Sequence, residues 1–378
     1  MTGQAALRGA ADTASEWLFG RAMPLWLEHG VDWRRGGFFE ALDLATLENR
    51  ADFKRLRVTT RQIYVFVEGA VAGVPRSREA VDHGLAFLLG PSRHPDGGFA
   101  SRCDMDGAIV DPTRDLYDLA FTLFALAHAH RLTGAANLKA EALALLDFIG
   151  TRLRHPGAGF AEAIPPVLPR RQNPHMHLLE AALACAEHMA DPAFDALCDE
   201  LAGLARSRFL DAGAGVLREY YRDDLTPLRD AQGRALIEPG HHFEWAWLLT
   251  EYARIRGREV PGGVALAEIA LRQGLDPATG LLRGELFDDG SIAAAEVRLW
   301  PHGEWLKAAL ALPGAAGDPL AAWDALRRFL DVPTPGLWRE QWDPASATFL
   351  AKPAPASSLY HITTAVMELR RYAAGGPA

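Results

Sequence analysis

Two kinds of helical pattern alternate along the chain. In the first kind, apolar residues form one stripe and charged residues cover the opposite face, as in residues 77–89 and 138–153. In the second kind, Ala, Leu, Phe and Trp occupy most faces; these segments are residues 57–70, 116–132, 175–188, 242–255, 300–312 and 360–372. A helix with one apolar stripe lies at the surface, whereas a helix that is apolar on most faces is buried. The pattern predicts pairs of one outer and one inner helix.

A glycine-centred turn recurs between the two helices of each pair. Its six copies are Gly36-Gly37-Phe38-Phe39-Glu40, Gly97-Gly98-Phe99-Ala100, Gly157-Ala158-Gly159-Phe160-Ala161-Glu162, Gly215-Val216-Leu217-Arg218-Glu219, Gly280-Leu281-Leu282-Arg283-Gly284-Glu285 and Gly336-Leu337-Trp338-Arg339-Glu340. They recur roughly every 55 to 65 residues, and a fixed period indicates a repeat architecture. An open solenoid would give the same signal, but six pairs are what ring closure needs. We therefore predict an all-α fold, an (α/α)6 barrel of six inner and six outer helices, with residues 1–378 as a single domain.

Strand-like pieces follow these turns, for example residues 38–40 and 218–221. They predict short β-hairpin loops at one end of the barrel, where the inner helices begin. The segment 211–239 is longer than the other loops, and residues 220–235 form a charged, hairpin-like stretch. It can be a lid that excludes water from a cavity, or equally a solvated hairpin.

Charge and composition limit the partners that we expect. The 378 residues carry a formal net charge of -9 without a basic tract, which argues against nucleic acid. The chain lacks an apolar run long enough for a bilayer, and it does not begin like a signal peptide. Cys103, Cys185 and Cys198 have no metal-binding spacing and are expected to be buried thiols. We expect a cytoplasmic protein, a monomer or homodimer, that acts on a small molecule and binds no membrane.

Polar residues concentrate at the starts of the predicted inner helices. From the first helix to the sixth they are Arg61, Gln62 and Tyr64; Asp115, Tyr117 and Asp118; Asn173, His175 and His177; His241, His242 and Glu244; Arg298, Trp300, His302 and Glu304; and Tyr360 and His361. Each one alone could be a helix cap or a hydrogen-bonded core group. In a closed ring, however, the six starts meet at one mouth, so we expect a shared cavity.

The turn that contains His241 carries the most specific chemistry. Residues 238–247 read Glu-Pro-Gly-His-His-Phe-Glu-Trp-Ala-Trp, which places His241 and Glu244 on one face of a first helical turn. An imidazole beside a carboxylate is suited to proton transfer near neutral pH. The titratable groups here are mainly histidines rather than the paired carboxylates of a glycosidase, which favours proton transfer next to a carbonyl.

A zinc site is an alternative for these histidines. His175-x-His177 and His241-His242 offer nitrogen ligands, although adjacent side chains on a helix point about 100° apart. The spacing also differs from the HExxH pattern of zinc proteases. We therefore expect no metal.

At these same residues the chain resembles the N-acylglucosamine 2-epimerase superfamily. The matching segments are 57–62 (Arg-Val-Thr-Thr-Arg-Gln), 115–121 (Asp-Leu-Tyr-Asp-Leu-Ala-Phe), 170–180 (Arg-Arg-Gln-Asn-Pro-His-Met-His-Leu-Leu-Glu), 238–245, 298–301 and 360–361. The forms at 36–40 and 172–177 look most like the D-mannose isomerase branch. The resemblance implies an (α/α)6 barrel and a sugar isomerase or epimerase that needs no metal or other cofactor.

The resemblance also implies a role for each site residue. His361 and His241 match the two catalytic histidines: His361 would take the C2 proton, and His241 would open the sugar ring or act on the other face. Glu244 would orient His241, and Arg61 would hold the carbonyl oxygen. The residues implied to contact the sugar are Tyr117, Asn173, His177 and Glu304 through its hydroxyls and Trp300 as a wall. His175 and His242 would have supporting roles at most.

The expected reaction is the interconversion of D-mannose and D-fructose, and of D-lyxose and D-xylulose, through an enediolate. A 2-epimerase acting on mannose and glucose, an N-acylglucosamine or a cellobiose-like sugar is the alternative within the superfamily. Arg170, Arg171 and Arg298 leave a phosphosugar open. A sugar-binding protein without catalysis is the alternative from a different class.

Overall fold

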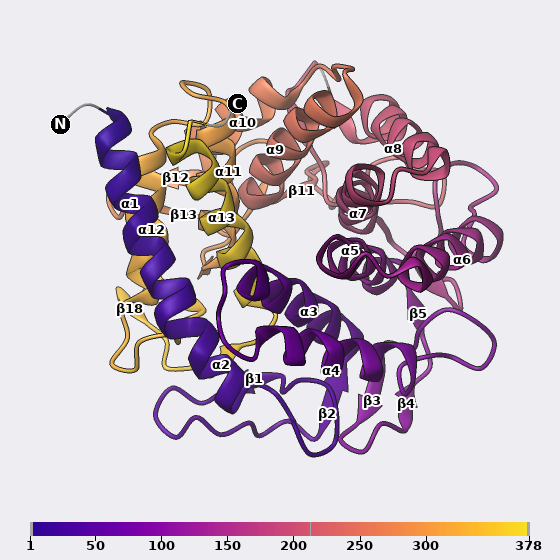
Figure 1. Ribbon diagram of the computed structural model, residues 1–378. Helices are drawn as coiled ribbons and strands as arrows, with labels where there is room; N and C mark the ends of the chain where they lie inside the picture. Colours follow the sequence, from indigo (N-terminus) through magenta and orange to yellow (C-terminus); the bar gives the residue numbers. More distant parts are fainter. Residues whose placement is uncertain (1–2, 212, 376–378) are drawn as a thin grey trace.

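Two concentric layers of helices form a closed ring in the computed structural model, which describes residues 3–211 and 213–375 (Figure 1). The inner helices are α3 (Leu56–Val71), α5 (Leu116–Thr133), α7 (Asn173–Met189), α9 (Pro239–Arg256), α11 (Trp300–Ala311) and α13 (Ser358–Ala373). The outer helices are α1 (Gly3–Trp17) continued by α2 (Met23–His29), α4 (Ser77–Leu89), α6 (Ala136–Arg152), α8 (Pro192–Leu204), α10 (Gly263–Ile269) and α12 (Pro319–Leu330). Each inner helix packs against the next, and α13 packs against α3. The (α/α)6 barrel is confirmed, and the open solenoid is excluded because the ring closes.

Burial separates the two layers as the apolar pattern predicts. Every residue of α11 from Pro301 to Ala311 is buried, whereas α12 buries only one stripe. A helix that is surrounded on all sides must be apolar on most faces, and an outer helix needs only one such face. Three short π-helical turns extend the outer layer: Leu18–Ala22 joins α1 to α2, Ala205–Phe209 follows α8 and Ala270–Gly274 follows α10.

The first and last repeats are fastened to each other. Trp26 of α2 stacks on Trp338 at 5.2 Å between ring centroids, and its Nε1 donates to the carbonyl of Gly336. Gly336 has φ of 102°, and a Cβ there would lie 3.0 Å from the Ala22 Cα, so this contact needs glycine. Strand β1 (Ala41–Leu42) also pairs with β19 (Ala354–Pro355). The chain ends of the ring are thus joined by both side chains and backbone.

Short strands gather where the inner helices begin, as predicted. Besides β1 and β19 they are β2 (Phe53–Arg55), β3 (Arg102–Asp104), β4 (Ile109–Asp111), β5 (Arg114–Asp115), β6 (Ala163–Ile164), β7 (Arg170–Arg171), β8 (Leu210–Asp211), β9 (Val216–Leu217), β10 (Tyr220–Tyr221), β11 (Leu236–Ile237), β12 (Leu275–Asp276), β13 (Leu281–Leu282), β14 (Glu285–Phe287), β15 (Ile292–Ala294), β16 (Val297–Arg298), β17 (Gln341–Asp343) and β18 (Thr348–Phe349). All the pairings are antiparallel, in sheets of two or three strands. They connect neighbouring repeats around the mouth.

Three buried histidines fasten the recurring turns to the inner helices. Each Nε2 accepts from a backbone N–H of the turn, and each Nδ1 donates to the carbonyl four residues earlier. The turn and histidine pairs are Phe160 with His175 at 3.1 Å, Leu217 with His242 at 3.1 Å, and Leu282 with His302 at 3.0 Å. Burial lowers the pKa of His175 to about 3 and the pKa values of His242 and His302 to about 4. These rings are neutral structural groups, and both of their nitrogens are occupied.

We predict that His302→Ala lowers the free energy of unfolding by about 1–3 kcal/mol for each backbone group left without a partner. The substitution leaves the Leu282 N–H and the Arg298 carbonyl unpaired in a buried site. Urea unfolding followed by circular dichroism measures the change. An unchanged free energy of unfolding would contradict the structural role of this ring.

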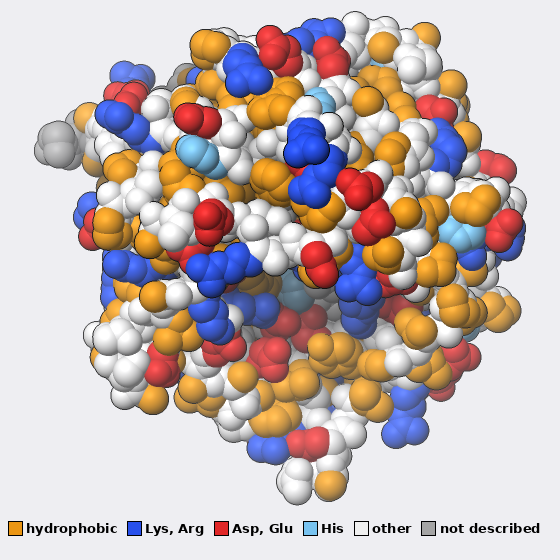
Figure 2. All heavy atoms as spheres, turned by 90° about the horizontal axis from the view of Figure 1, so that it is seen from below, with side chains coloured by type: hydrophobic (Ala, Val, Ile, Leu, Met, Phe, Trp, Pro, Cys, Tyr) orange, Lys and Arg blue, Asp and Glu red, His pale blue; other side chains and the backbone are white. Residues whose placement is uncertain are grey.

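Acidic, basic and apolar side chains are interspersed over the side of the molecule drawn in Figure 2, without a broad basic area. In the described part of the chain, every helix is too short or too polar to cross a membrane.

Candidate active site

A cavity of about 230 Å³ lies at the mouth where the inner helices begin. Its lining residues are Arg61, Tyr117, Asn173, His177, Glu238, His241, Glu244, Arg298, Trp300, Glu340, Ser357, Ser358 and His361. The ring therefore brings together, around one cavity, eight of the nine site residues that were predicted from the sequence. The ninth, Glu304, lies behind His361 and is fully buried.

His241 lies beside two carboxylates, Glu219 from the preceding turn and Glu238 three residues before it in the sequence. Its Nδ1 lies 2.9 Å from Glu219 Oε2 and 4.0 Å from Glu238 Oε1, and its Nε2 lies 3.1 Å from Asn173 Nδ2. Burial alone would lower the pKa of His241, but the two carboxylates outweigh it and raise the pKa to about 9. His241 is therefore protonated near neutral pH, and its Nε2–H then needs the Asn173 amide to present its oxygen, which has no other partner among the described residues, in place of Nδ2. The expectation that Glu244 orients His241 is wrong, because the carboxylate that accepts from His241 Nδ1 belongs to Glu219.

The recurring turn explains how Glu219 arrives there. In the third repeat, the last residue of the turn, Glu162, accepts from both the backbone N–H and the Nε of Arg171. In the fourth repeat, Glu219 likewise accepts from the backbone N–H of Glu238, at 3.3 Å. Glu238 has no guanidinium to offer, so the second oxygen of Glu219 accepts from His241. A structural carboxylate of the repeat thus becomes the partner of a cavity histidine.

His361 stands in a contrasting environment. Its Nδ1 donates to Glu304 Oε1 at 2.8 Å. Burial lowers the pKa of His361 well below its ordinary value, and the charges of Arg61 and Lys307 lower it further. The ring is neutral near neutral pH, with Nε2 free of any described hydrogen bond and able to accept a proton. The expected contact between Glu304 and a sugar hydroxyl is replaced by this bond.

Trp300 separates the two histidines. Its ring centroid lies 4.9 Å from that of His241 and 5.6 Å from that of His361. The indole therefore forms a wall of the cavity, as expected, with a protonated imidazole on one side and a neutral imidazole on the other. An apolar wall of this kind limits how both rings can turn.

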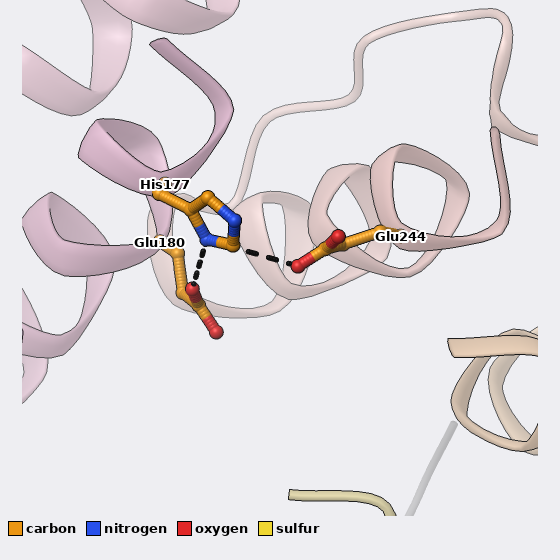
Figure 3. Close-up of side chains that lie close together, drawn as sticks. All are labelled: His177, Glu180 and Glu244. Atoms are coloured by element: carbon orange, nitrogen blue, oxygen red, sulfur yellow. Dashed lines mark hydrogen bonds and ion pairs between the residues drawn. The ribbon is translucent and has the colours of Figure 1, made fainter. Parts of the chain in front are cut away.

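Glu244 and His177 form the deeper part of the cavity (Figure 3). Both carboxyl oxygens of Glu244 are buried without a hydrogen-bond partner in the described chain. Burial, together with repulsion from Glu304, raises the pKa of Glu244 well above its ordinary value. His177 Nδ1 lies 3.0 Å from Glu180 Oε2 and 3.7 Å from Glu244 Oε1, and burial lowers its pKa to about 4. A buried carboxyl with unused oxygens and a neutral imidazole in this position are suited to hydrogen bonds with uncharged hydroxyls.

Arg61 provides a cation that is not neutralised by a direct partner. Its Nη2 donates to the Tyr117 hydroxyl at 2.5 Å and its Nη1 to the Ser357 carbonyl at 3.3 Å, while its Nε has no partner among the described residues. The guanidinium also packs over the Phe121 ring at 4.2 Å. A buried guanidinium that lacks a carboxylate contact favours an oxygen that becomes negatively charged.

Three groups of side chains in the described chain lie close enough to hold a cation. They are His177 with Glu180 and Glu244, His241 with Glu219 and Glu238, and His361 with Glu244 and Glu304. In each group, however, the histidine Nδ1 already forms a hydrogen bond to a carboxylate. The zinc pairs considered from the sequence also lose His175 and His242, whose nitrogens bind backbone groups. We therefore interpret these groups as hydrogen-bonded acid–imidazole pairs rather than metal ligands.

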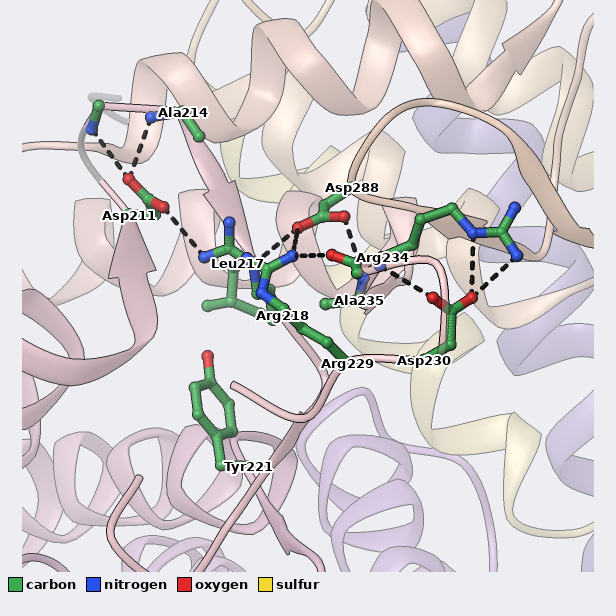
Figure 4. Close-up of polar contacts among 12 residues, drawn as sticks. Asp211, Ala214, Leu217, Arg218, Tyr221, Arg229, Asp230, Arg234, Ala235 and Asp288 are labelled. Atoms are coloured by element: carbon green, nitrogen blue, oxygen red, sulfur yellow. Dashed lines mark hydrogen bonds and ion pairs between the residues drawn. The ribbon is translucent and has the colours of Figure 1, made fainter. Parts of the chain in front are cut away.

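The charged segment before α9 is held by ion pairs and hydrogen bonds, several of them to Asp288 (Figure 4). Asp288 accepts from Arg218 Nε at 2.9 Å, from Arg229 Nη1 at 3.0 Å and from the Ala235 backbone N–H at 3.0 Å. The lining of the cavity includes none of residues 220–235. These contacts favour the hairpin interpretation over the lid.

Sequence and structure comparisons identify the family of the chain. The sequence model of N-acylglucosamine 2-epimerase matches residues 37–365. A mannose-6-phosphate isomerase of Rhizobium meliloti (strain 1021) is 39% identical over 372 residues, which cover 93% of this chain and 95% of that protein.

Two solved structures share the fold over almost the whole chain. The cellobiose 2-epimerase of Spirochaeta thermophila has a TM-score of 0.86 at 24% identity and covers 99% of both chains. A D-mannose isomerase has a TM-score of 0.84 at 22% identity and covers 96% of this chain and 97% of its own. With the family match extending over most of the sequence, the chain belongs to the N-acylglucosamine 2-epimerase family of sugar isomerases and epimerases.

Proposed function

We propose that this enzyme interconverts D-mannose and D-fructose through an enediolate, and D-lyxose and D-xylulose in the same way. The main support is a pair of histidines, His361 and His241, that line one cavity, lie against the same Trp300 ring and donate through Nδ1 to different buried carboxylates. Their surroundings shift their pKa values in opposite directions, down for His361 and up for His241. Two titratable groups whose environments separate their pKa values are suited to the roles of base and acid. The names of the relatives, mannose-6-phosphate isomerase and D-mannose isomerase, favour isomerisation.

The reaction begins with the cyclic aldose in the cavity. His241 donates its Nε2 proton to the ring oxygen as the bond from C1 to that oxygen breaks, and it takes the proton of the anomeric hydroxyl as the C1 carbonyl forms. Neutral His361 then removes the proton from C2, the C–H electrons form the C1–C2 double bond, and the carbonyl electrons move to O1. Arg61 stabilises the negative charge on that oxygen. Tyr117, Asn173, His177 and Glu244 hold the hydroxyls, and Trp300 covers the apolar side of the sugar.

The second half of the reaction decides between two products. If the His361 imidazolium returns its proton to C1, and the O2 proton passes to O1 as the C2 carbonyl forms, the product is the ketose. If His241 donates a proton to the opposite face of C2, the product is the 2-epimer. The cavity volume of about 230 Å³ favours a single sugar ring over a disaccharide of the cellobiose type.

We predict that kcat/KM falls as the pH rises through about 9, because His241 acts in its protonated form and its pKa is about 9. The acidic limb lies well below pH 6.5, because His361 acts in its neutral form. Glu219→Gln removes a carboxylate that raises the pKa of His241, so the alkaline limb moves to lower pH. A pH profile of wild type and variant measures both limbs. An alkaline limb that stays in place in Glu219→Gln would contradict the assignment.

A phosphorylated substrate is the second candidate, favoured by the name of the 39% identical relative. The three arginines that could have bound a phosphate all have partners within the protein. Arg170 donates to the carbonyls of Ala158 and Phe160 at 2.6 and 3.1 Å. Arg171 pairs with Glu162 at 2.7 Å, and Arg298 pairs with Glu238 at 2.9 Å. Arg298 lines the cavity beside acidic Glu238 and Glu340. The charge at the mouth thus favours an uncharged sugar.

Product analysis by NMR with a panel of aldoses tests the proposal. We expect fructose from mannose, and a higher kcat/KM for mannose than for mannose 6-phosphate. Glucose that accumulates before fructose would establish the epimerase instead. Binding of mannose without any turnover would support the sugar-binding alternative.

We predict that dialysis against EDTA leaves kcat for mannose unchanged, because the carboxylates nearest the catalytic histidines are engaged in hydrogen bonds rather than in metal coordination. A chelated sample to which divalent zinc or manganese is returned serves as the control. Loss of activity that the metal restores would contradict this prediction.

A further inference from the structure

Lys307 is a fully buried charge that the proposed mechanism does not use. Its Nζ lies 2.6 Å from Glu304 Oε2, and its side chain has no exposed surface. It stands one turn below Glu304 on α11 and is absent from the lining of the cavity. Lysine is almost never fully buried unless it is paired, so the burial of Lys307 depends on its carboxylate partner.

Glu304 lies between this ammonium and a catalytic histidine. One carboxylate oxygen accepts from His361 Nδ1 at 2.8 Å, and the other faces Lys307 Nζ. Among the described residues, Lys307 is the only lysine or arginine in contact with Glu304. Glu304 therefore connects the buried ammonium of Lys307 to the imidazole of His361, which lines the cavity.

We propose that Lys307 is a positioning residue that fixes and neutralises Glu304, so that His361 stays unprotonated and can act as the base. The proposal rests on the function proposed above, because it explains how one of its two histidines is kept ready. Lys307 touches neither the sugar nor the reacting atoms.

The second histidine of the cavity provides an internal comparison. His241 also donates through Nδ1 to a buried carboxylate, Glu219, at 2.9 Å. In the described chain no lysine or arginine contacts Glu219, which accepts instead from the neutral amide of Gln172 at 2.9 Å. Despite burial, the pKa of His241 is raised to about 9, whereas the pKa of His361 is lowered well below its ordinary value. The charges around the two pairs differ: Glu238 adds a second carboxylate near His241, whereas Arg61 and the Lys307 ammonium add positive charge near His361. Of these, only Lys307 contacts the carboxylate that binds the histidine.

The other charges around Lys307 are accounted for. The titratable and charged groups that act on Lys307 or His361 come from five inner helices: Arg61 on α3, His177 and Glu180 on α7, Glu244 on α9, Glu304 on α11, and Tyr360 and Glu368 on α13. Glu180 already accepts from His177 Nδ1 and from the Tyr360 hydroxyl, and Glu244 has a raised pKa. Lys307 Nζ also lies 3.8 Å from the centre of the Trp247 ring, which fixes its direction.

The test is Lys307→Met, which keeps an unbranched side chain and removes the charge. Without the ammonium, Glu304 favours the imidazolium form of His361. We expect the acidic limb of kcat/KM to move up by about 1–3 pH units, with KM on the pH plateau little changed. NMR titration of labelled histidines should show the same shift at His361 and none at His241. Unshifted values for both the limb and the His361 pKa would overturn the proposal.

A second pair of variants covers the case in which Lys307→Met fails to fold. Glu304→Gln leaves the ammonium unpaired next to His361, whereas Glu304→Gln/Lys307→Met removes both charges, and removing both partners of a buried pair is better tolerated than removing one. We expect a higher His361 pKa in the double variant than in Glu304→Gln. Equal values would overturn the proposal. The NMR readout needs no turnover, so failure of the mannose reaction and failure of this proposal remain distinguishable.

Discussion

Replacement of His361 by glutamine is expected to lower kcat for mannose by about 10²–10⁴, the contribution of a positioned general base. Glutamine keeps a hydrogen-bonding group near Glu304 but cannot take a proton from carbon. The C2–H of an aldose is only weakly acidic, so no other neutral group of the cavity replaces the imidazole at this position. Because sugar contacts come from other residues, KM changes much less than kcat.

The structural histidine His302 provides the matched control for this loss. It is also fully buried at the start of an inner helix, but its nitrogens bind the Leu282 N–H and the Arg298 carbonyl. His302→Gln is expected to affect the free energy of unfolding, whereas His361→Gln retains the wild-type circular dichroism spectrum and loses turnover. Equal kcat values in His361→Gln and wild type would remove His361 from the mechanism.

Arg61→Met is expected to lower kcat by about 10²–10³, comparable to the loss of an oxyanion-hole donor. The guanidinium stabilises charge that develops on O1 only as the C2 proton leaves, so kcat falls more than KM rises. The apolar replacement still packs against Phe121, over which Arg61 lies at 4.2 Å. Steady-state kinetics with mannose measures the split between kcat and KM.

Arg131→Met serves as the control for this substitution. Arg131 is an inner-helix arginine of α5, but it pairs with Glu68 and lines a different cavity from the one that contains His361. We expect its kcat to stay close to that of wild type. If Arg61→Met raises KM and leaves kcat unchanged, Arg61 binds the ground state only and the enediolate role is wrong.

The closed ring of helices could be predicted from the sequence because two independent patterns repeat along the chain. The alternation of striped and fully apolar helices separates the layers, and the glycine-centred turns count the repeats. Ring closure also places His241 and His361 together, although 120 residues separate them. Local pattern and global fold agree here, which is typical of sequences that specify one structure.

The partners of the histidines were harder to predict for a physical reason. Helical spacing pointed to Glu244 as the partner of His241, because residues three apart share a face. In the structure Glu244 turns into the ring, and Glu219 reaches His241 from the preceding turn. The signal was present in the repeated Glu at the end of the turn, but it needed the pairing of Glu162 with Arg171 to be interpreted. The role of Lys307 could not be predicted, because the sequence does not distinguish a buried lysine in an apolar helix from an exposed one.

Isotope exchange tests the central claim most directly. Wild type and His361→Gln are incubated with D-mannose in D₂O, and deuterium at C1 of fructose is followed by NMR. The account predicts fructose that carries deuterium at C1 with wild type, and neither exchange nor ketose at a comparable rate with His361→Gln. Absence of both exchange and ketose with wild type, or exchange at the wild-type rate with His361→Gln, would contradict it.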